Sequence, residues 1–172
     1  KEIGHLSDVA DFVLLDGVCD AIRLLNQAGF LVICITNQPV IARGELTISG
    51  LETIHMKMES ELGLKGAFLD DIYFCPHHPD SGFEGEVKAL KTICQCRKPK
   101  PGMLLDAQRK FNIDLKESWL VGDHVRDIEA GINAGVKTIL LSDNGTLADH
   151  SCRELFEAVG HILDAAGISS DK

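Results

Sequence analysis

Three features are missing from this sequence of 172 residues: a long apolar run, a surplus of basic residues, and an internal repeat. A membrane-spanning helix needs about 20 consecutive apolar residues, so we expect no membrane-embedded segment. The formal net charge of −9 argues against nucleic acid and anionic membranes as partners, because both bind basic surfaces. Residues 1–16 have neither the apolar core nor the cleavage site of a secretory signal. We therefore expect a cytoplasmic protein.

Four potential metal ligands occur as two close pairs, Cys75-Pro-His77 and Cys94-Gln-Cys96. Zinc favours four nitrogen or sulfur ligands in a tetrahedron. The glycines and prolines between the pairs supply the irregular turns that would let both pairs reach one ion. The alternative is four unrelated residues, since free cysteine is often simply buried. Two pairs separated by a weakly apolar loop favour a zinc site formed by Cys75, His77, Cys94 and Cys96.

Strand-like and helix-like patterns alternate along the chain. Helices are predicted over 16–28, 47–62, 101–111, 124–133 and 149–166, and strands over 30–35, 72–74, 118–121 and 136–141. The run at 30–35 is continuously apolar, which is typical of a buried parallel strand. The alternation predicts an α/β fold, a doubly wound parallel sheet covered by helices on both faces. A chain of this length fits a single domain over 1–172.

Polar residues follow the predicted strands, where parallel sheets bind their ligands. Thr36 and Asn37 offer a hydroxyl, an amide and turn N–H groups to phosphate oxygens, although they also suit an ordinary polar turn. Asp123 and Asp127 lie about one helical turn apart and suit Mg²⁺, although aspartate also caps helices. Arg43 fits either a phosphate contact or a solvated surface position.

These motifs, in this order, resemble the haloacid dehalogenase superfamily of phosphatases. The resemblance rests on Thr36-Asn37-Gln38 after an apolar strand, Cys96-Arg97-Lys98-Pro99-x-Pro101-Gly102-Met103, and Val121-Gly122-Asp123-x-x-x-Asp127. The two metal-ligand pairs and Ile41-Ala42-Arg43-Gly44 are similar to the branch of heptose bisphosphate phosphatases. That branch shares its zinc loop with the histidinol-phosphate phosphatases. The resemblance covers residues 1 to about 141.

The resemblance implies a Rossmann-like fold with a zinc-stabilised loop and Mg²⁺-dependent hydrolysis of a heptose 1,7-bisphosphate through an aspartyl-phosphate. The implied catalytic residues are Thr36, Lys98 and Asp123. The implied substrate-binding residues are Thr36, Asn37, Gln38, Arg43, Arg97, Lys98 and His124. Asp123 is the implied Mg²⁺ ligand, with Asp127 in support, and residues 2–5 fall where relatives have a substrate-contacting loop. We expect a monomer whose partner is a phosphorylated sugar. Hydrolysis of histidinol phosphate is the alternative function, and a catalytically inactive zinc-stabilised binding domain is the second alternative.

The superfamily's nucleophile motif, Asp-x-Asp-Gly-Thr, is absent from the sequence. Asp16-Gly17-Val18 imitates it, but Leu14 stands where the first aspartate belongs, and Asp16 suits the N-cap of the following helix. A parallel sheet without its middle strand would leave buried backbone groups unpaired. We therefore expect the native protein to have a further strand before Lys1, and we expect the chain without it to be nearly inactive. His124 stands where relatives often have lysine, so that phosphate contact should be weaker.

Overall fold

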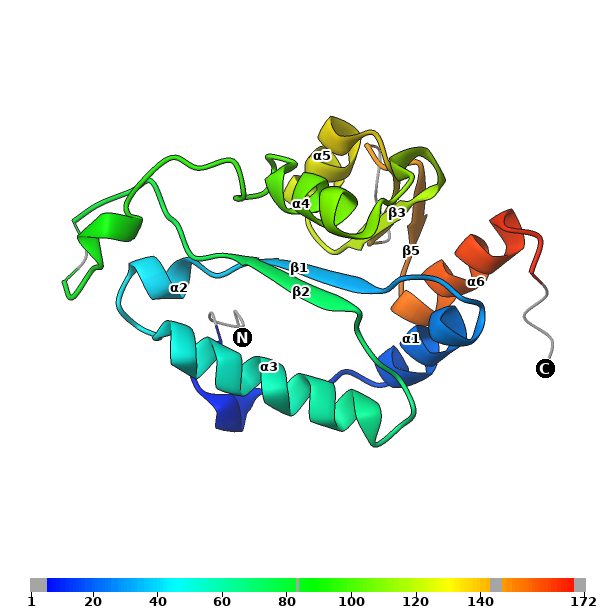
Figure 1. Cartoon of the computed structure of the whole chain (residues 1–172), viewed down its shortest axis with the longest axis horizontal. Coiled ribbons are helices and arrows are strands. Elements are labelled where there is room, and N and C mark those ends of the chain that lie inside the picture. Colours follow the sequence, from blue (N-terminus) through cyan, green and yellow to red (C-terminus); the bar gives the residue numbers. More distant parts are fainter. Residues whose placement is uncertain (1–5, 83, 143–146, 169–172) are drawn as a thin grey trace.

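The computed structural model describes residues 6–82, 84–142 and 147–168, and it contains two groups of parallel strands surrounded by helices (Figure 1). The first group consists of β1 (Ile33–Asn37) and β2 (Asp71–Cys75). The second has the order β3 (Trp119–Gly122), β4 (Lys137–Leu141) and β5 (His150–Cys152). Every pairing is parallel, so the predicted α/β class is confirmed.

Six α-helices and three short 3-10 turns complete the described part of the chain. The α-helices are α1 (Val18–Gln27), α2 (Pro39–Ala42), α3 (Ile48–Gly63), α4 (Gly102–Phe111), α5 (Val125–Ala134) and α6 (Leu155–Ala165). The 3-10 turns are η1 (Val9–Asp11), η2 (Lys88–Leu90) and η3 (Leu115–Glu117). Figure 1 shows α3 along one side of β1 and β2, with α4 and α5 on the other side. None of the helices described has the length and apolar character that crossing a membrane requires.

The core is divided into several apolar clusters. Ala21 of α1 packs against Val159 and Leu163 of α6, and these two helices lie side by side in Figure 1. Val40 and the next residue of α2 pack against Leu51 of α3. All four residues of α2 are buried, so the segment that follows β1 is firmly anchored.

The two groups of strands are separated by a groove rather than joined by hydrogen bonds. Among the described residues, β1 pairs with no strand other than β2, and β3 pairs with no strand other than β4. The groove has a volume of about 830 Å³, and its lining includes Ile33, Ile35, Leu120 and Val121. The parallel strand predicted at 30–35 is present as β1, but it begins only at Ile33, and its residues are half-buried rather than buried. Leu31, before the strand, is 50% exposed.

The predicted helix at 149–166 is wrong over its first residues, which form β5 and the turn after it. The backbone N–H of Thr138 donates a hydrogen bond of 2.7 Å to the Asp149 carboxylate, and the Thr138 hydroxyl donates another of 2.9 Å. These bonds place the chain beside β4 just before β5 begins. Tertiary pairing therefore outweighs the local helical pattern.

The start of α1 also differs from the prediction. Its N-cap is Gly17, not Asp16, and no side chain caps the helix. Gly17 has φ 78°, in the left-handed region that glycine adopts without steric cost. The sequence therefore places the helix correctly but misassigns its cap.

Candidate metal and active sites

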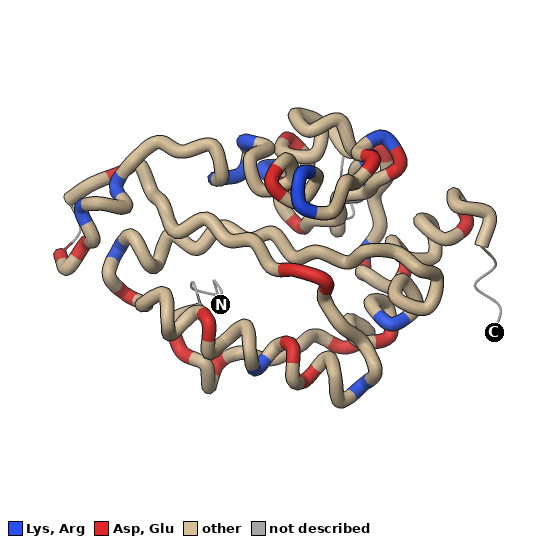
Figure 2. The backbone as a smooth tube through the Cα atoms, in the orientation of Figure 1, with Lys and Arg blue, Asp and Glu red and all other residues tan. Residues whose placement is uncertain are grey.

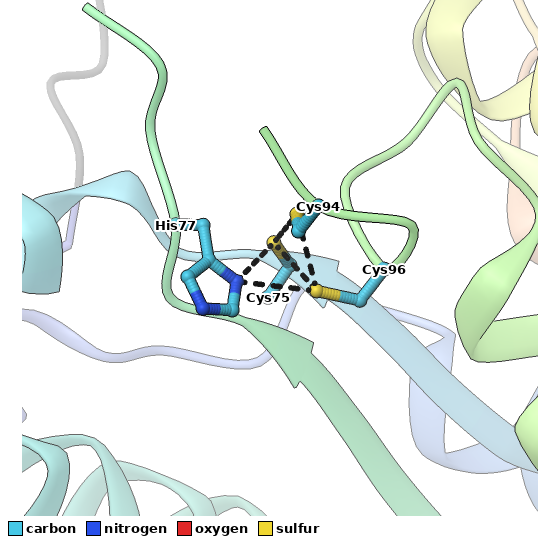
Figure 3. Close-up of side chains that lie close together, drawn as sticks. All are labelled: Cys75, His77, Cys94 and Cys96. Atoms are coloured by element: carbon cyan, nitrogen blue, oxygen red, sulfur yellow. Dashed lines mark hydrogen bonds between the residues drawn. The ribbon is translucent and has the colours of Figure 1, made fainter. Parts of the chain in front are cut away.

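The four predicted zinc ligands lie together at the carboxyl end of β2 (Figure 3). Their ligand atoms are all within 4.8 Å of one another. Cys75 Sγ lies 3.5 Å from Cys94 Sγ and 3.1 Å from Cys96 Sγ. His77 Nδ1 lies 3.7 Å from Cys75 Sγ and 3.3 Å from Cys96 Sγ. The two pairs, 19 residues apart in the chain, therefore converge on one point.

This donor set fits a structural zinc ion. Zinc–sulfur bonds of about 2.3 Å in a tetrahedron place sulfur atoms about 3.8 Å apart, and the observed separations of 3.1, 3.3 and 3.5 Å are about 0.3–0.7 Å shorter. Burial raises the pKa of the Cys75 thiol, and its contact with Cys96 adds to the effect. A zinc ion would therefore displace a proton from Cys75 on binding.

Two glycines allow neighbouring segments to pack tightly against the metal loop. A Cβ atom on Gly102, at the start of α4, would overlap the carbonyl group of Gln95, which lies between the two cysteine ligands. A Cβ atom on Gly44 would overlap the carbonyl of Gly85, and Gly44 has φ +78°. The loop is thus held between the segment after β1 and the first turn of α4.

The groove between the sheets brings together the residues predicted for catalysis. Thr36, Lys98, Asp123 and Asp127 all line it. Thr36 belongs to β1, and Asp123 directly follows β3, so both lie at carboxyl ends of parallel strands. This is the edge where α/β proteins bind ligands.

Lys98 connects the two sides of this groove. Its ammonium nitrogen lies 2.8 Å from Asp127 Oδ1 and donates a hydrogen bond of 2.9 Å to the carbonyl of Ile35. The side chains of Lys98 and Asp127 are 12% and 7% exposed, so this ion pair is only weakly screened by solvent. The basic segment that contains Lys98 lies between the metal loop and α4 (Figure 2).

Asp127 is committed to contacts within the protein. Its Oδ2 accepts a hydrogen bond of 3.1 Å from the backbone N–H of His124. Its Oδ1 faces the Lys98 ammonium at 2.8 Å. We interpret Asp127 as the counter-ion of Lys98, and its supporting role in Mg²⁺ binding stays a prediction.

Gly122 allows Asp127 to approach the end of β3. A Cβ atom at Gly122 would overlap the Asp127 side chain, with Cγ and Oδ2 both 2.8 Å away. In the sequence, Gly122 is recognisable only as part of a motif. No signal in a single sequence reveals that its hydrogen atom faces a carboxylate.

Asn37 and Gln38 make contacts within the protein. Asn37 Nδ2 donates a hydrogen bond of 3.0 Å to the Lys98 carbonyl, and its Oδ1 accepts one of 3.0 Å from the Lys98 N–H. Gln38 Nε2 donates a hydrogen bond of 3.2 Å to Thr36 Oγ1. A hydroxyl that accepts one hydrogen bond still has its own proton to donate. Thr36 and Asn37 are the last two residues of β1 rather than part of a turn.

The remaining predicted substrate-binding residues do not line the groove. Arg97 is half-buried, and its Nη1 donates a hydrogen bond of 3.3 Å to the carbonyl of His77. Arg43 follows α2, and His124 is an exposed residue before α5. Burial lowers the pKa of His78, and the charges of Arg97 and Arg43 lower it further. These cations therefore act on the same buried imidazole beside the metal loop. The predicted loop at 2–5 lies outside the described residues.

Sequence reasoning missed one contact of the Lys98 segment. Asn133, near the end of α5, donates a hydrogen bond of 3.0 Å from Nδ2 to the carbonyl of Pro99. A lone asparagine late in a helix gives no sequence signal for such a contact. The segment is therefore held by side chains from both sides of the groove.

Comparison with known sequences identifies relatives of this chain. The HAD-hydrolase-like family matches residues 95–163. The D-glycero-beta-D-manno-heptose-1,7-bisphosphate 7-phosphatase of Yersinia pestis is 42% identical over 142 residues, which cover 83% of this chain and 73% of that protein. The protein of the same name from Escherichia coli strain K12 is 41% identical over 142 residues, covering 83% of this chain and 72% of that protein.

Solved structures are similar over most of the chain. The D,D-heptose 1,7-bisphosphate phosphatase of B. bronchiseptica, complexed with magnesium and phosphate, is 31% identical with a TM-score of 0.78. The similarity covers 92% of this chain and 88% of that one. A putative HAD-like phosphatase from Mesorhizobium loti is 29% identical with a TM-score of 0.83, covering 96% of this chain and 80% of that one.

Proposed function

This chain belongs to the D-glycero-β-D-manno-heptose-1,7-bisphosphate 7-phosphatase family of haloacid dehalogenase-like hydrolases, and we propose that it hydrolyses the 7-phosphate of that sugar bisphosphate. The observation that carries the proposal is the convergence of Thr36, Lys98 and Asp123 on one groove. These residues come from three distant parts of the chain. A shared phosphoryl site gives their convergence a single explanation.

Lys98 and Thr36 are the proposed contacts of the phosphoryl oxygens. The Lys98 ammonium is preorganised by Asp127 and by the Ile35 carbonyl, so little reorganisation would be needed as negative charge develops. The Thr36 hydroxyl would donate its proton in a hydrogen bond to another oxygen. Preorganised donors of this kind are worth about 10²–10³-fold each in kcat.

Asp123 is the proposed protein ligand of a magnesium ion. Asp123 is exposed and lines the same groove as Thr36, and Mg²⁺ prefers one or two carboxylates together with water and phosphate oxygens. The donor chemistry therefore fits the ion. When bound, Mg²⁺ would neutralise phosphate charge and orient the phosphoryl group.

The proposed zinc ion has a structural role. Four protein ligands would close its coordination shell, leaving no open position for substrate. Arg97 directly follows Cys96 and bonds to the carbonyl of His77, so the metal loop holds the guanidinium in place. We propose that Arg97 and Arg43 bind the sugar phosphate away from the reacting bond.

We also propose that one more parallel strand occupies the groove between β1 and β3 and supplies the nucleophilic aspartate. The inner edges of both strands pair with no strand among the described residues, and unpaired strand edges readily accept another strand. The aspartate oxygen would attack phosphorus as the bond from phosphorus to the sugar oxygen breaks and that oxygen takes a proton. Water would then hydrolyse the aspartyl-phosphate to inorganic phosphate.

The expected setting is a monomer in the cytoplasm, without nucleic acid or membrane partners. The six cysteines are free thiols, and zinc ligation requires reduced cysteines. Acidic residues are spread along most of the chain (Figure 2), which disfavours polyanions as partners. Sedimentation analysis would test the oligomeric state.

The decisive experiment assays the full-length protein with Mg²⁺ on heptose 1,7-bisphosphate and on histidinol phosphate in parallel. We expect release of one phosphate from the heptose substrate and the higher kcat/KM for it. Lys98→Ala should lower kcat about 10²–10³-fold, whereas Lys65→Ala, at an exposed position after α3, should not. A higher kcat/KM on histidinol phosphate would refute the heptose assignment. No hydrolysis of either compound would favour an inactive zinc-stabilised binding domain.

A further inference from the structure

The side chain of Asn37 is tied to the backbone of Lys98 by two hydrogen bonds. Asn37 Nδ2 donates to the Lys98 carbonyl, and Asn37 Oδ1 accepts from the Lys98 N–H, both at 3.0 Å. The residues are 61 positions apart in the chain, and both bonds are partly buried. Two bonds in opposite directions fix both the position and the orientation of the Lys98 peptide.

The anchor for this tether is rigid. Asn37 ends β1 and is in register with Cys75 of β2, and α2 directly beyond it is fully buried. The Lys98 ammonium is held separately, by Asp127 and the Ile35 carbonyl. A lysine side chain loses rotamer entropy when it is ordered, so fixing its backbone reduces the remaining freedom of its charge.

The chain contains a second tether of the same design, formed by two residues that do not line the groove. Asn26 Nδ2 donates a hydrogen bond of 3.2 Å to the Phe68 carbonyl, and the Phe68 N–H donates one of 3.0 Å to Asn26 Oδ1. This pair is exposed. It provides an internal control for the loss of two side chain–backbone hydrogen bonds.

We propose that Asn37 is a positioning residue that acts through Lys98, instead of holding the substrate phosphate with its side chain. This inference rests on the proposed phosphatase function, in which Lys98 contacts the phosphoryl group. Both polar atoms of the Asn37 side chain are engaged with Lys98, which leaves one amide hydrogen of Nδ2 outside the tether, and Asn37 is not among the residues that line the groove where the phosphoryl group is proposed to bind. Loss of the tether should therefore misplace the lysine charge without removing a substrate contact.

The kinetic test is a cycle of Asn37→Ala, Lys98→Ala and the double variant in the full-length protein, assayed on heptose 1,7-bisphosphate. Misplacement by about 1 Å can cost up to 10²-fold, so Asn37→Ala should lower kcat about 10–100-fold and change KM less than about threefold. Adding it to Lys98→Ala should have little further effect, because residues that act as a unit are not additive. Multiplicative losses, or a raised KM with unchanged kcat, would overturn the proposal.

A second measurement does not depend on activity. Hydrogen exchange followed by NMR should show Asn37→Ala accelerating exchange of the Lys98 amide and leaving the Phe68 amide unchanged. Asn26→Ala should do the reverse and leave kcat unaltered. If the wild-type protein hydrolysed no phosphoester, the proposed function would fail. The tether would then be tested by the exchange rate of the Lys98 amide alone. Unchanged exchange there in Asn37→Ala would refute it.

Discussion

Replacing Gly122 by alanine adds a single methyl group and should lower both the folding stability and the catalytic activity of the protein. The new Cβ would overlap the Asp127 side chain, whose own Cβ at 2.3 Å would lie about 1.1 Å inside the ordinary contact distance of 3.4 Å. An equal retreat of Asp127 would stretch its 2.8 Å contact with Lys98 beyond the usual range of a hydrogen bond. Overpacking of this kind costs about 1–3 kcal/mol of folding stability.

The expected loss of activity follows from the displaced charge. Because Lys98 would lose part of its preorganisation, kcat on heptose 1,7-bisphosphate should fall about 10–100-fold. Denaturant unfolding and steady-state kinetics on the full-length protein would measure both effects. Gly122→Ala with wild-type stability and wild-type kcat would refute the packing argument.

Two other glycines provide matched controls. A Cβ added at Gly160 in α6 would meet no neighbouring group within 4 Å, so Gly160→Ala should stabilise the protein by about 0.5–1 kcal/mol. A Cβ at Gly131 would lie 2.5 Å from Thr138 Cγ2, so Gly131→Ala should also be destabilising. Because that Cβ would meet none of the proposed catalytic residues, kcat of Gly131→Ala should stay near that of the wild type. If Gly131→Ala lost as much kcat as Gly122→Ala, the loss in Gly122→Ala would be explained by general destabilisation of the fold.

Three further predictions concern the metal, the substrate and pH. Protein purified without added metal should contain about one equivalent of zinc and lose it in Cys94→Ser but not in Cys19→Ser; elemental analysis below half an equivalent would contradict the site. Arg97→Ala should raise KM for heptose 1,7-bisphosphate about tenfold or more, whereas Arg109→Ala, whose partner is Asp106 on the exposed side of α4, should leave KM unchanged. Hydrogen bonds from the backbone N–H and hydroxyl of Thr138 lower the pKa of Asp149, so its stabilisation should be present above the unfolded value of about 3.9 and disappear as pH falls through the lower folded pKa. The difference in unfolding free energy between the wild type and Asp149→Asn should shrink below about pH 4, and a difference independent of pH would count against the assignment.

Much of the fold could be predicted because local patterns and tertiary pairing agree. The helix predicted at 47–62 is α3, at Ile48–Gly63, and the strand predicted at 118–121 is β3, at Trp119–Gly122. The prediction of helix at 149–154 was wrong because β5 has only three residues and forms through pairing with β4. A local pattern contains no information about a partner strand that lies elsewhere in the chain.

Residue types and their spacing were enough to predict the chemistry of each site. Paired cysteine and histidine ligands, and polar residues placed after apolar strands, are properties of residue type and spacing. They indicate the metal loop and the proposed phosphoryl site without any knowledge of the tertiary structure.

The partners of individual polar atoms, by contrast, became visible only in the folded structure. The Asn37 side chain bonds to the Lys98 backbone, and Asp127 is the counter-ion of the Lys98 ammonium. In the sequence, Asn37 instead suggested a phosphate ligand and Asp127 a supporting residue for Mg²⁺. Gly122 leaves room for the side chain of Asp127, which is five residues away in the chain. Hydrogen bonds and close contacts depend on distances between atoms, and those distances exist only once the strands have brought remote segments together.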